Sequence, residues 1–531
     1  MMKKILSLAL ALAMLLSCSS ALAAEHLEGY YTPPHMNEGQ YPIAEEGVTL
    51  TYYMALNGGA ANFISSYDEN PSYQAVQKNT GVDIEFIHPA DGTFSESVKY
   101  LLMNPDQLPD MIQFQRDDIV SGGVRALYEN GVIIDLAPYL DEFAPQYKEV
   151  VMHDEVAQRQ IMDGDKIYAF YKITYADAMP YVRINSNKDL LNEFGMEEPV
   201  TIEEYEAYFQ KILDEKPGVI PLYTRYNSDE QCNLIMGAFD ILRDWFMVDE
   251  TTVGYYANAP QYKEYLELMN RWYTKGYLTA DFTSLTQPEA ESMFEQGQIA
   301  CIAASVDQMY SNVGDRFTVT NFPYLRKTKD QVIGNSLASY PVDQANMWYT
   351  VITSSCKNVE AAIQYMNYGY TYEGSLYFSF GVEGEHWNWG ENGLPQFTDE
   401  ILHNPLGMTI SNVSYALKIH FGSRYCYPDA IGHPGTASNQ EALRIRTLWA
   451  DDEHEQDFLR LPPITLTTEE AEARAELMAQ VTTYADEMML KFITGAASLD
   501  TFDAYVQEVN ARGLTDALTI TQGAVDRYFG K

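Results

Sequence analysis

The first part of the chain alternates between strand-like and helix-like patterns. Apolar and polar residues alternate at residues 48–54 and 82–86, and a third strand-like run covers residues 110–114. Residues 67–79 and 95–103, which separate these runs, can form helices. Strands separated by helices of this length predict right-handed units of a parallel α/β sheet.

In such sheets, ligands bind at the carboxyl ends of the strands. This rule points to Asn57 and Gly58 after the first strand, and to Gln115 and Arg116 after the third. We therefore expect part of a binding site at these positions.

The middle and the end of the chain are more helical. Thr201 with Glu204, and Thr467 with Glu470, have the spacing at which two side chains cap the first amides of a helix. Apolar residues follow both pairs at helical spacing, and we interpret these stripes as core. Two further strand-like runs lie at residues 299–303 and 348–352.

The first 23 residues have the features of a secretory signal peptide. Lys3 and Lys4 precede an apolar run, and small residues end at Ala23. We favour cleavage after Ala23, although residues 15–18 also resemble a lipobox, whose Cys18 would then carry a lipid. No later run is long and apolar enough for a membrane span. The sequence thus predicts an exported, extracellular or cell-surface protein.

The net charge of -41 changes to -43 when Lys3 and Lys4 leave with the leader. A body this acidic argues against nucleic acid as a partner. The hydrophobic content of 46% is nevertheless sufficient for a large core. Residues 24–46 are rich in Pro, Glu and Gly and lack periodicity, so we expect a flexible segment there.

Motifs for catalysis or for metal binding are absent from the sequence. The nine histidines occur singly, the order of an EF-hand loop is missing, and so are the usual hydrolase and nucleotide motifs. For His386 we expect a structural role. Cys232, Cys301, Cys356 and Cys426 form no C-x-x-C pair, and the sequence leaves open whether any of them form a disulfide. A carboxylate pair for glycoside hydrolysis could still assemble from distant residues.

Aromatic residues are the most informative feature of the composition. The chain contains 40 tyrosines and six tryptophans. The apolar face of a sugar ring covers an aromatic ring, and its hydroxyl groups pair with polar side chains. This composition favours a sugar-binding protein.

The order of several short motifs from residue 46 to the end resembles the family-1 extracellular solute-binding proteins of bacterial ABC sugar importers, especially their larger lipoprotein-type branch. The motifs lie at residues 80–83 (TGVD), 108–111 (LPDM), 131–136 (GVIIDL), 163–169 (DGDKIYA), 187–195 (NKDLLNEFG), 294–300 (FEQGQIA), 361–367 (AAIQYMN) and 381–387 (GVEGEHW). Tyr171 is a small departure, because the family pattern has a proline nearby.

The resemblance implies a two-lobed α/β fold, like that of periplasmic binding proteins, with a ligand cleft between the lobes. We expect residues 47–174 and 340–390 to form lobe 1, and residues 175–339 and 391–531 to form lobe 2. It also implies a non-catalytic monomer without a cofactor, which captures a sugar, by preference an oligosaccharide, and delivers it to the permease subunits of an ABC transporter by hinge closure.

On this basis we expect seven ligand-binding residues: Asn57, Gln113, Arg116, Tyr171, Trp348, Trp387 and Trp389. Neither a catalytic residue nor a metal ligand is predicted. Three other functions stay open: a secreted glycan hydrolase, a binding protein for a peptide or another small polar solute, and an adhesion module.

Overall fold

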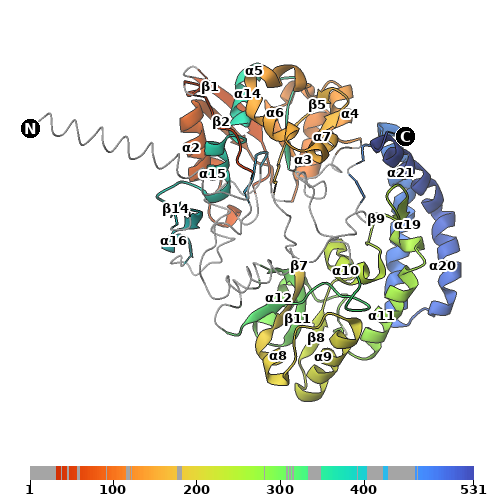
Figure 1. Cartoon of the computed structure of the whole chain (residues 1–531). Helices are drawn as coiled ribbons and strands as arrows, with labels where there is room; N and C mark the ends of the chain where they lie inside the picture. Colours follow the sequence, from red (N-terminus) through yellow and green to blue (C-terminus); the bar gives the residue numbers. More distant parts are fainter. Residues whose placement is uncertain are drawn as a thin grey trace, which may run out of the picture. The chain divides into compact units, whose positions relative to one another are not determined.

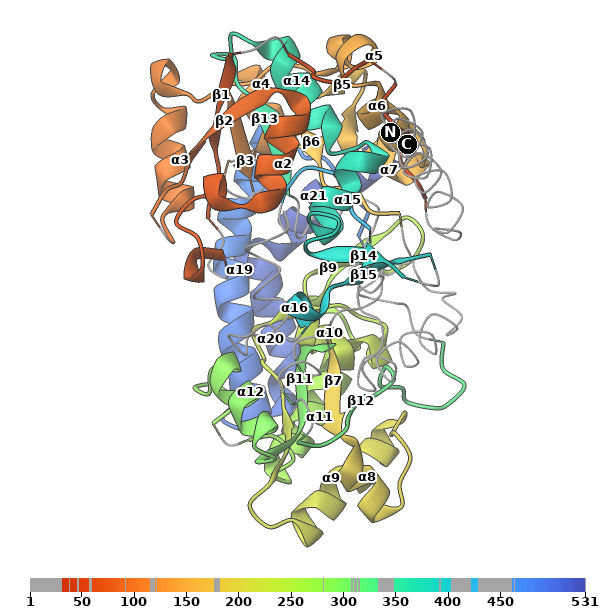
Figure 2. The same cartoon turned by 90° about the vertical axis from the view of Figure 1, so that its left-hand side faces the viewer.

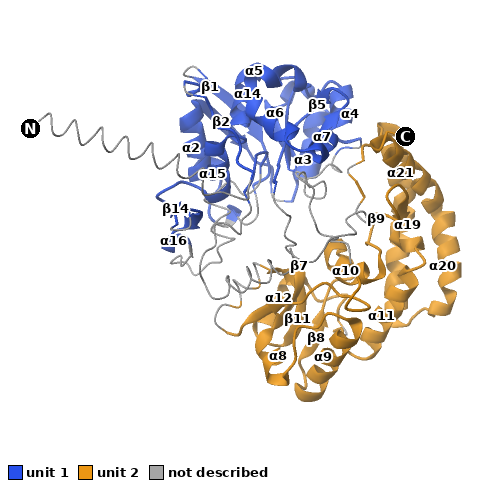
Figure 3. Ribbon diagram, viewed as in Figure 1, with its two compact units in different colours: residues 1–176, 340–434 blue, residues 177–339, 435–531 orange. Residues whose placement is uncertain are grey.

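The chain divides into two compact units in the computed structural model (Figure 3). Unit 1 comprises residues 1–176 and 340–434, and unit 2 comprises residues 177–339 and 435–531. The structure describes residues 31–37, 39–44, 47–56, 60–90, 92–114, 120, 122–175, 182–279, 281–306, 309, 313, 316–332, 348–390, 393–402, 422–427, 461–462 and 464–530. The predicted signal peptide and Cys18 therefore lie outside the described residues.

Unit 1 is built on a five-stranded sheet of order β2-β1-β3-β13-β6. Its strands are β1 (Val48–Tyr53), β2 (Val82–Ile87), β3 (Met111–Phe114), β6 (Phe170–Tyr171) and β13 (Tyr349–Ile352). β1 is parallel to β2 and β3, whereas β13 is antiparallel to β3 and β6. The three predicted parallel strands are thereby confirmed.

Helices cover both faces of this sheet (Figures 1 and 2). Tyr73 of α2 contacts Phe86 of β2, with 4.8 Å between ring centroids. Phe86 lies on the same face of the sheet as Tyr52, its partner on β1. Phe94 of α3 contacts Phe114 on the opposite face, at 6.3 Å. The helices are α2 (Pro71–Thr80), α3 (Phe94–Leu102), α4 (Gly123–Glu129), α5 (Leu140–Phe143), α6 (Pro145–Met152), α7 (Glu155–Ile161), α14 (Val359–Tyr368), α15 (Tyr372–Phe380) and α16 (Asp399–Leu402).

The helix predicted at residues 67–79 begins later, at Pro71. The Asn70 side chain accepts hydrogen bonds from the amides of Ser72 and Tyr73, at 2.9 and 3.1 Å. Proline fits the first helical position because it has no amide hydrogen to satisfy. Residues Tyr67–Glu69 form a separate 3₁₀ turn. Local capping therefore sets this boundary.

The N-terminal segment packs against unit 1 wherever it is described. Ile43 N donates to Thr80 O at 2.7 Å, and Pro34 O accepts from Tyr372 N at 3.1 Å. His35 Nδ1 lies 2.9 Å from the Glu373 carboxylate. These contacts fix residues 31–37 and 39–44, a part of the segment that we expected to be flexible.

Unit 2 has a four-stranded sheet of order β12-β7-β11-β8. β8 and β11 are parallel, and β7 is antiparallel to β11 and β12. The strand predicted at residues 299–303 is confirmed as β11. The strands of this unit are β7 (Val182–Asn187), β8 (Ile220–Tyr223), β11 (Ile299–Ser305) and β12 (Val319–Asn321), with a separate hairpin of β9 (Trp245–Met247) and β10 (Val253–Tyr255).

Both predicted capping pairs in unit 2 are confirmed. Thr201 and Glu204 cap α9, and Thr467 and Glu470 cap α19, which ends before Gly495. The helices are α8 (Lys188–Phe194), α9 (Ile202–Glu215), α10 (Asp229–Met236), α11 (Tyr262–Thr274), α12 (Gln287–Glu295), α19 (Thr468–Thr494), α20 (Phe502–Val509) and α21 (Thr515–Tyr528). Over the part of the chain that the structure describes, none of the helices combines the length and the apolarity needed to cross a membrane.

The partition differs from the expected one after residue 390. β15 (Pro395–Phe397) pairs with β14 (Trp387–Trp389), and Tyr425 forms a parallel bridge with Ile173. Residues 393–402 and 422–427 therefore belong to unit 1, although the sequence assigned them to lobe 2. The bridge joins residues far apart in the chain, which a local pattern does not reveal.

The capping box of α9 gives a prediction about acid stability. Glu204 accepts hydrogen bonds from the Val200 and Thr201 amides and lies 2.7 Å from the Lys329 ammonium group. The hydrogen bond from Lys329 and those from the two amides lower its pKa to about 2. Its stabilising contribution is thus complete above the ordinary carboxyl pKa and is lost as the pH falls towards 2.

We expect Thr201→Ala to lower the free energy of unfolding by about 1 kcal/mol at pH 7. Glu204→Gln should also destabilise at pH 7, with a difference from wild type that disappears between pH 5 and 2. Urea unfolding across this range measures both effects, with the exposed neighbour Glu203→Gln as control. Parallel pH profiles for Glu204→Gln and wild type would contradict the assignment.

Candidate functional site

Three of the predicted ligand-binding residues lie at one edge of the unit 1 sheet. The strand directions bring the carboxyl ends of β1, β2, β3 and β6 together with the amino end of β13. We call this the carboxyl edge of unit 1. Gln113 lies near the end of β3, Tyr171 ends β6, and Trp348 precedes β13. The backbone hydrogen bond from Lys172 N to Trp348 O, 2.9 Å long, joins Trp348 to the residue after Tyr171.

Aromatic rings form a row along this edge. The ring of Tyr349 stacks on Phe114, with 5.2 Å between centroids, and lies 5.6 Å from Tyr171. Tyr171 and Tyr349 are buried, whereas Trp348 is half-buried. Trp348, the residue before Tyr349, therefore has more surface to offer to a ligand than either tyrosine.

Gln113 belongs to a buried hydrogen-bond network. Its Nε2 donates to the hydroxyl group of Tyr52 at 3.2 Å, and that hydroxyl lies 2.6 Å from Thr350 Oγ1. Thr350 Oγ1 is in turn 2.7 Å from Ser423 Oγ. Burial raises the pKa of Tyr52 well above its ordinary value, so the hydroxyl stays protonated. This placement favours a structural role for Gln113.

The two predicted tryptophans near residue 388 lie on the separate β14–β15 hairpin. Trp387 is buried and donates from Nε1 to Gly381 O at 2.9 Å. Trp389 is half-buried and meets Trp387 edge to face, with 5.0 Å between centroids. His386 Nδ1 accepts from Val382 N at 2.9 Å, which agrees with the structural role expected for this histidine.

The predicted residues Asn57 and Arg116 lie outside the described residues, as does Gln115. The described chain just before Asn57 is held by His88, which follows β2. His88 Nδ1 is 2.9 Å from Met54 O, and Nε2 accepts from the Tyr67 amide at 3.2 Å. The amide can only donate, so Nδ1 carries the proton and donates to Met54 O.

The carboxyl ends of the parallel strands β8 and β11 form an equivalent edge in unit 2, which the sequence did not reveal. Arg225 and Tyr226 follow β8 and are half-buried. A relay of amides holds this loop: Arg225 N donates to Gln231 Oε1 at 2.8 Å, and Gln231 Nε2 donates to Gln287 Oε1 at 3.0 Å. Gln287 Nε2 reaches Ala303 O of β11 at 3.2 Å. The strand rule would have found this loop if residues 220–223 had been recognised as a strand.

Cys232 supports the same loop from α10. Its thiol donates towards Tyr226 O and Arg225 O, at 3.2 and 3.4 Å. Burial raises the pKa of Cys232 to about 12, so the group is a thiol rather than a nucleophilic thiolate. Cys232, Cys301, Cys356 and Cys426 are all buried free thiols. Among the described residues, no three His, Cys, Asp or Glu side chains gather as a metal site.

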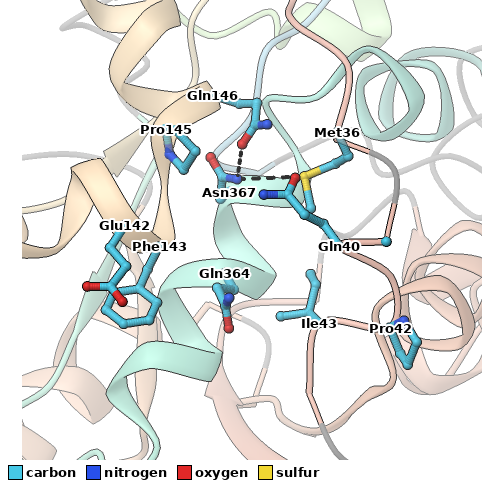
Figure 4. Close-up of a pocket in the computed structure, with 11 residues that line it drawn as sticks. Met36, Gln40, Pro42, Ile43, Glu142, Phe143, Pro145, Gln146, Gln364 and Asn367 are labelled. Atoms are coloured by element: carbon cyan, nitrogen blue, oxygen red, sulfur yellow. Dashed lines mark hydrogen bonds between the residues drawn. The ribbon is translucent and has the colours of Figure 1, made fainter.

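A separate pocket of about 240 Å³ lies between the N-terminal segment and the helices α5, α6 and α14 (Figure 4). Gln146 accepts from Asn367 Nδ2 at 2.6 Å across its wall. The backbone amide of another wall residue, Ile43, donates a hydrogen bond to Thr80 O, beside the amino end of β2. None of the seven predicted ligand-binding residues lines this pocket.

Two α/β units with polar and aromatic residues at their strand ends are the arrangement that the sequence resemblance implies. A comparison with known families points the same way. The family model described as bacterial extracellular solute-binding protein matches residues 71–379. The chain belongs to this family.

One curated relative is similar over almost the whole chain. The fructooligosaccharide ABC transporter substrate-binding protein FusA of Streptococcus pneumoniae serotype 4 is 24% identical over 99% of this chain and 98% of its own length.

Two solved structures have the same fold. FusA of S. pneumoniae in complex with kestose matches with a TM-score of 0.73 and 18% identity, covering 91% of this chain and 99% of that one. A solute-binding protein from Bifidobacterium longum infantis, described as HMO-binding and associated with an ABC transporter, matches with a TM-score of 0.72 and 15% identity, covering 92% and 100%. The predicted two-lobed α/β fold of solute-binding proteins is confirmed.

The buried network around Gln113 predicts a loss of stability when it is broken. Gln113→Ala leaves the Tyr52 hydroxyl with one partner fewer inside the core, so we expect the free energy of unfolding to fall by about 1–3 kcal/mol. Denaturant unfolding provides the measurement.

The matched control is Gln364→Ala. This half-buried side chain in the same unit makes no hydrogen bond within the described residues, so its loss should change stability by less than about 0.5 kcal/mol. If Gln113→Ala were as stable as the control, the network would not stabilise unit 1.

Proposed function

We propose that this protein captures a sugar, by preference an oligosaccharide, and delivers it to the membrane permease of an ABC transporter. The observation that carries the proposal is membership of the extracellular solute-binding family. Similarity to a fructooligosaccharide-binding component over nearly the full chain points in the same direction. The aromatic and polar groups at the two sheet edges are chemically suited to sugars.

The proposed ligand groups follow from the geometry of each edge. In unit 1, the half-buried Trp348 offers an aromatic surface to the apolar face of a sugar ring. In unit 2, Arg225 and Tyr226 offer groups that pair with hydroxyls, on a loop that the Gln231 relay holds in place. Tyr171, Trp389, Asn57 and Arg116 remain proposed contacts as well.

The finer parts of the function are proposals too. The leader and the family support export to the cell surface, with a lipid at Cys18 if the lipobox is used. We further propose a monomer that binds without catalysis and needs no cofactor.

A ligand screen tests the sugar proposal. The protein without residues 1–23 is heated with oligosaccharides, monosaccharides, amino acids and short peptides. A specific ligand at about 100 times its dissociation constant adds about 2.7 kcal/mol of stability, which raises the melting temperature.

We expect shifts with oligosaccharides and no hydrolysis products by chromatography. Turnover of a sugar would identify an enzyme. A higher melting temperature with peptides alone would identify a different solute. If none of the compounds changed the melting temperature, the sugar proposal would lose its support.

The role of Trp348 can be tested with the sugar that the screen identifies. Trp348→Ala should weaken binding about 10-fold, which corresponds to about 1.4 kcal/mol. The control is Tyr100→Ala, an exposed aromatic residue in the last turn of α3, which leads to the amino end of β3. Equal affinities of Trp348→Ala and the control in calorimetry would exclude Trp348 from the site.

Closure on the ligand, which the resemblance implies, also remains a prediction. If sugar contacts favour a closed form, saturating ligand should reduce the radius of gyration measured by X-ray scattering. Identical scattering with and without bound ligand would contradict closure.

A further inference from the structure

The chain leaves unit 1 for unit 2 after residue 176 and again after residue 434. The described segments that precede these two points lie side by side. Ile173 and Tyr425 form a parallel bridge, in which Ile173 N donates to Arg424 O at 2.9 Å and Cys426 N donates to Ile173 O at 2.9 Å. We call residues 173–175 and 424–427 the exit segments.

Tyr31 of the N-terminal segment contacts both exit segments. Its ring meets Tyr175 edge to face at 5.3 Å and Tyr425 at 5.5 Å between centroids. The hydroxyl group of Tyr425 donates to Tyr31 O at 2.9 Å. The other side of the cluster is His153, at the end of α6, whose ring lies 3.9 Å from that of Tyr31. One residue from outside both segments thus joins them to each other and to a helix.

The rest of the N-terminal segment holds Tyr31 in this place. His35 O accepts from Gln146 Nε2 at 3.3 Å, and Pro34 O accepts from Tyr372 N at 3.1 Å. His35 also pairs with Glu373 on α15. These contacts lie three and four residues after Tyr31, so the segment reaches the exit segments already anchored on unit 1.

We propose that Tyr31 is a positioning residue for ligand capture, which holds the two exit segments together and against the end of α6 close to the points where the chain leaves unit 1. This inference rests on the proposed function, because it concerns how binding is coupled to closure. Hinge motions are absorbed by a few residues at the ends of elements. Exit segments that are loose before binding must be ordered during binding, which lowers the affinity without any change at the sugar contacts.

A simple packing role for the N-terminal segment makes a different prediction. In that case any of its half-buried aromatic residues would contribute to stability, and none would affect binding. Tyr41 is the matched residue: it is half-buried on the same segment and meets Tyr368 edge to face at 5.5 Å, but it belongs to a different cluster from the exit segments. Tyr41→Ala removes the same side chain as Tyr31→Ala.

The experiment compares wild type, Tyr31→Ala, Tyr31→Phe and Tyr41→Ala. Hydrogen exchange of the free proteins reports on the amides of Ile173 and Cys426, whose bonds join the exit segments. Calorimetry with kestose, and with any other sugar that binds the wild type, gives the dissociation constant.

We expect both alanine variants to melt at a lower temperature. Only Tyr31→Ala should exchange faster at the amides of Ile173 and Cys426 and bind about 3–10 times more weakly, with Tyr31→Phe close to wild type because the ring remains. Exchange or affinity in Tyr31→Ala equal to that in Tyr41→Ala would overturn the proposal. If the wild type bound no sugar, the sugar function would fail separately, and hydrogen exchange would still decide whether Tyr31 braces the exit segments.

Discussion

The pairing of β13 with β3 and β6 is the interaction on which unit 1 depends. This strand joins the sheet antiparallel, from a part of the chain more than 200 residues after β3. Its Thr350 completes the buried network with Tyr52 and Ser423, and its first residue, Tyr349, completes the aromatic row. Without this strand, neither the polar groups of the core nor the Trp348 position would be held.

A buried network of hydroxyl and amide groups restricts the sheet to one register. A slip of β13 by one residue would turn Thr350 away from Tyr52 and leave polar groups unpaired inside the core. The same polar chemistry that binds sugars at a surface therefore serves here to align strands. This dual use explains why polar residues near strand ends are ambiguous when only their position in the sequence is known.

The features that the sequence predicted well are local. The capping pairs of α9 and α19 involve side chains three residues apart, and the first strands and helices follow one another along the chain. The features that it missed depend on distant partners. Gln113 donates to the buried hydroxyl group of Tyr52, and Tyr425 joins unit 1 because it bridges Ile173. The loop after β8 was missed because β8 has only four residues, too few to show a clear alternation of apolar and polar positions.

The N-terminal segment shows that a composition rich in proline and glycine does not by itself indicate flexibility. Its prolines and glycines lack periodicity, yet its backbone carbonyl groups find donors on α6 and α15, and its aromatic rings find partners in the core of unit 1. A segment without regular structure can be ordered when side chains from elsewhere satisfy its backbone. Gly81 allows the closest of these approaches, because a Cβ atom there would lie 2.8 Å from Cβ of Pro42. Where the structure describes it, the segment is thus a part of the fold of unit 1, and the exit segments pack against its Tyr31.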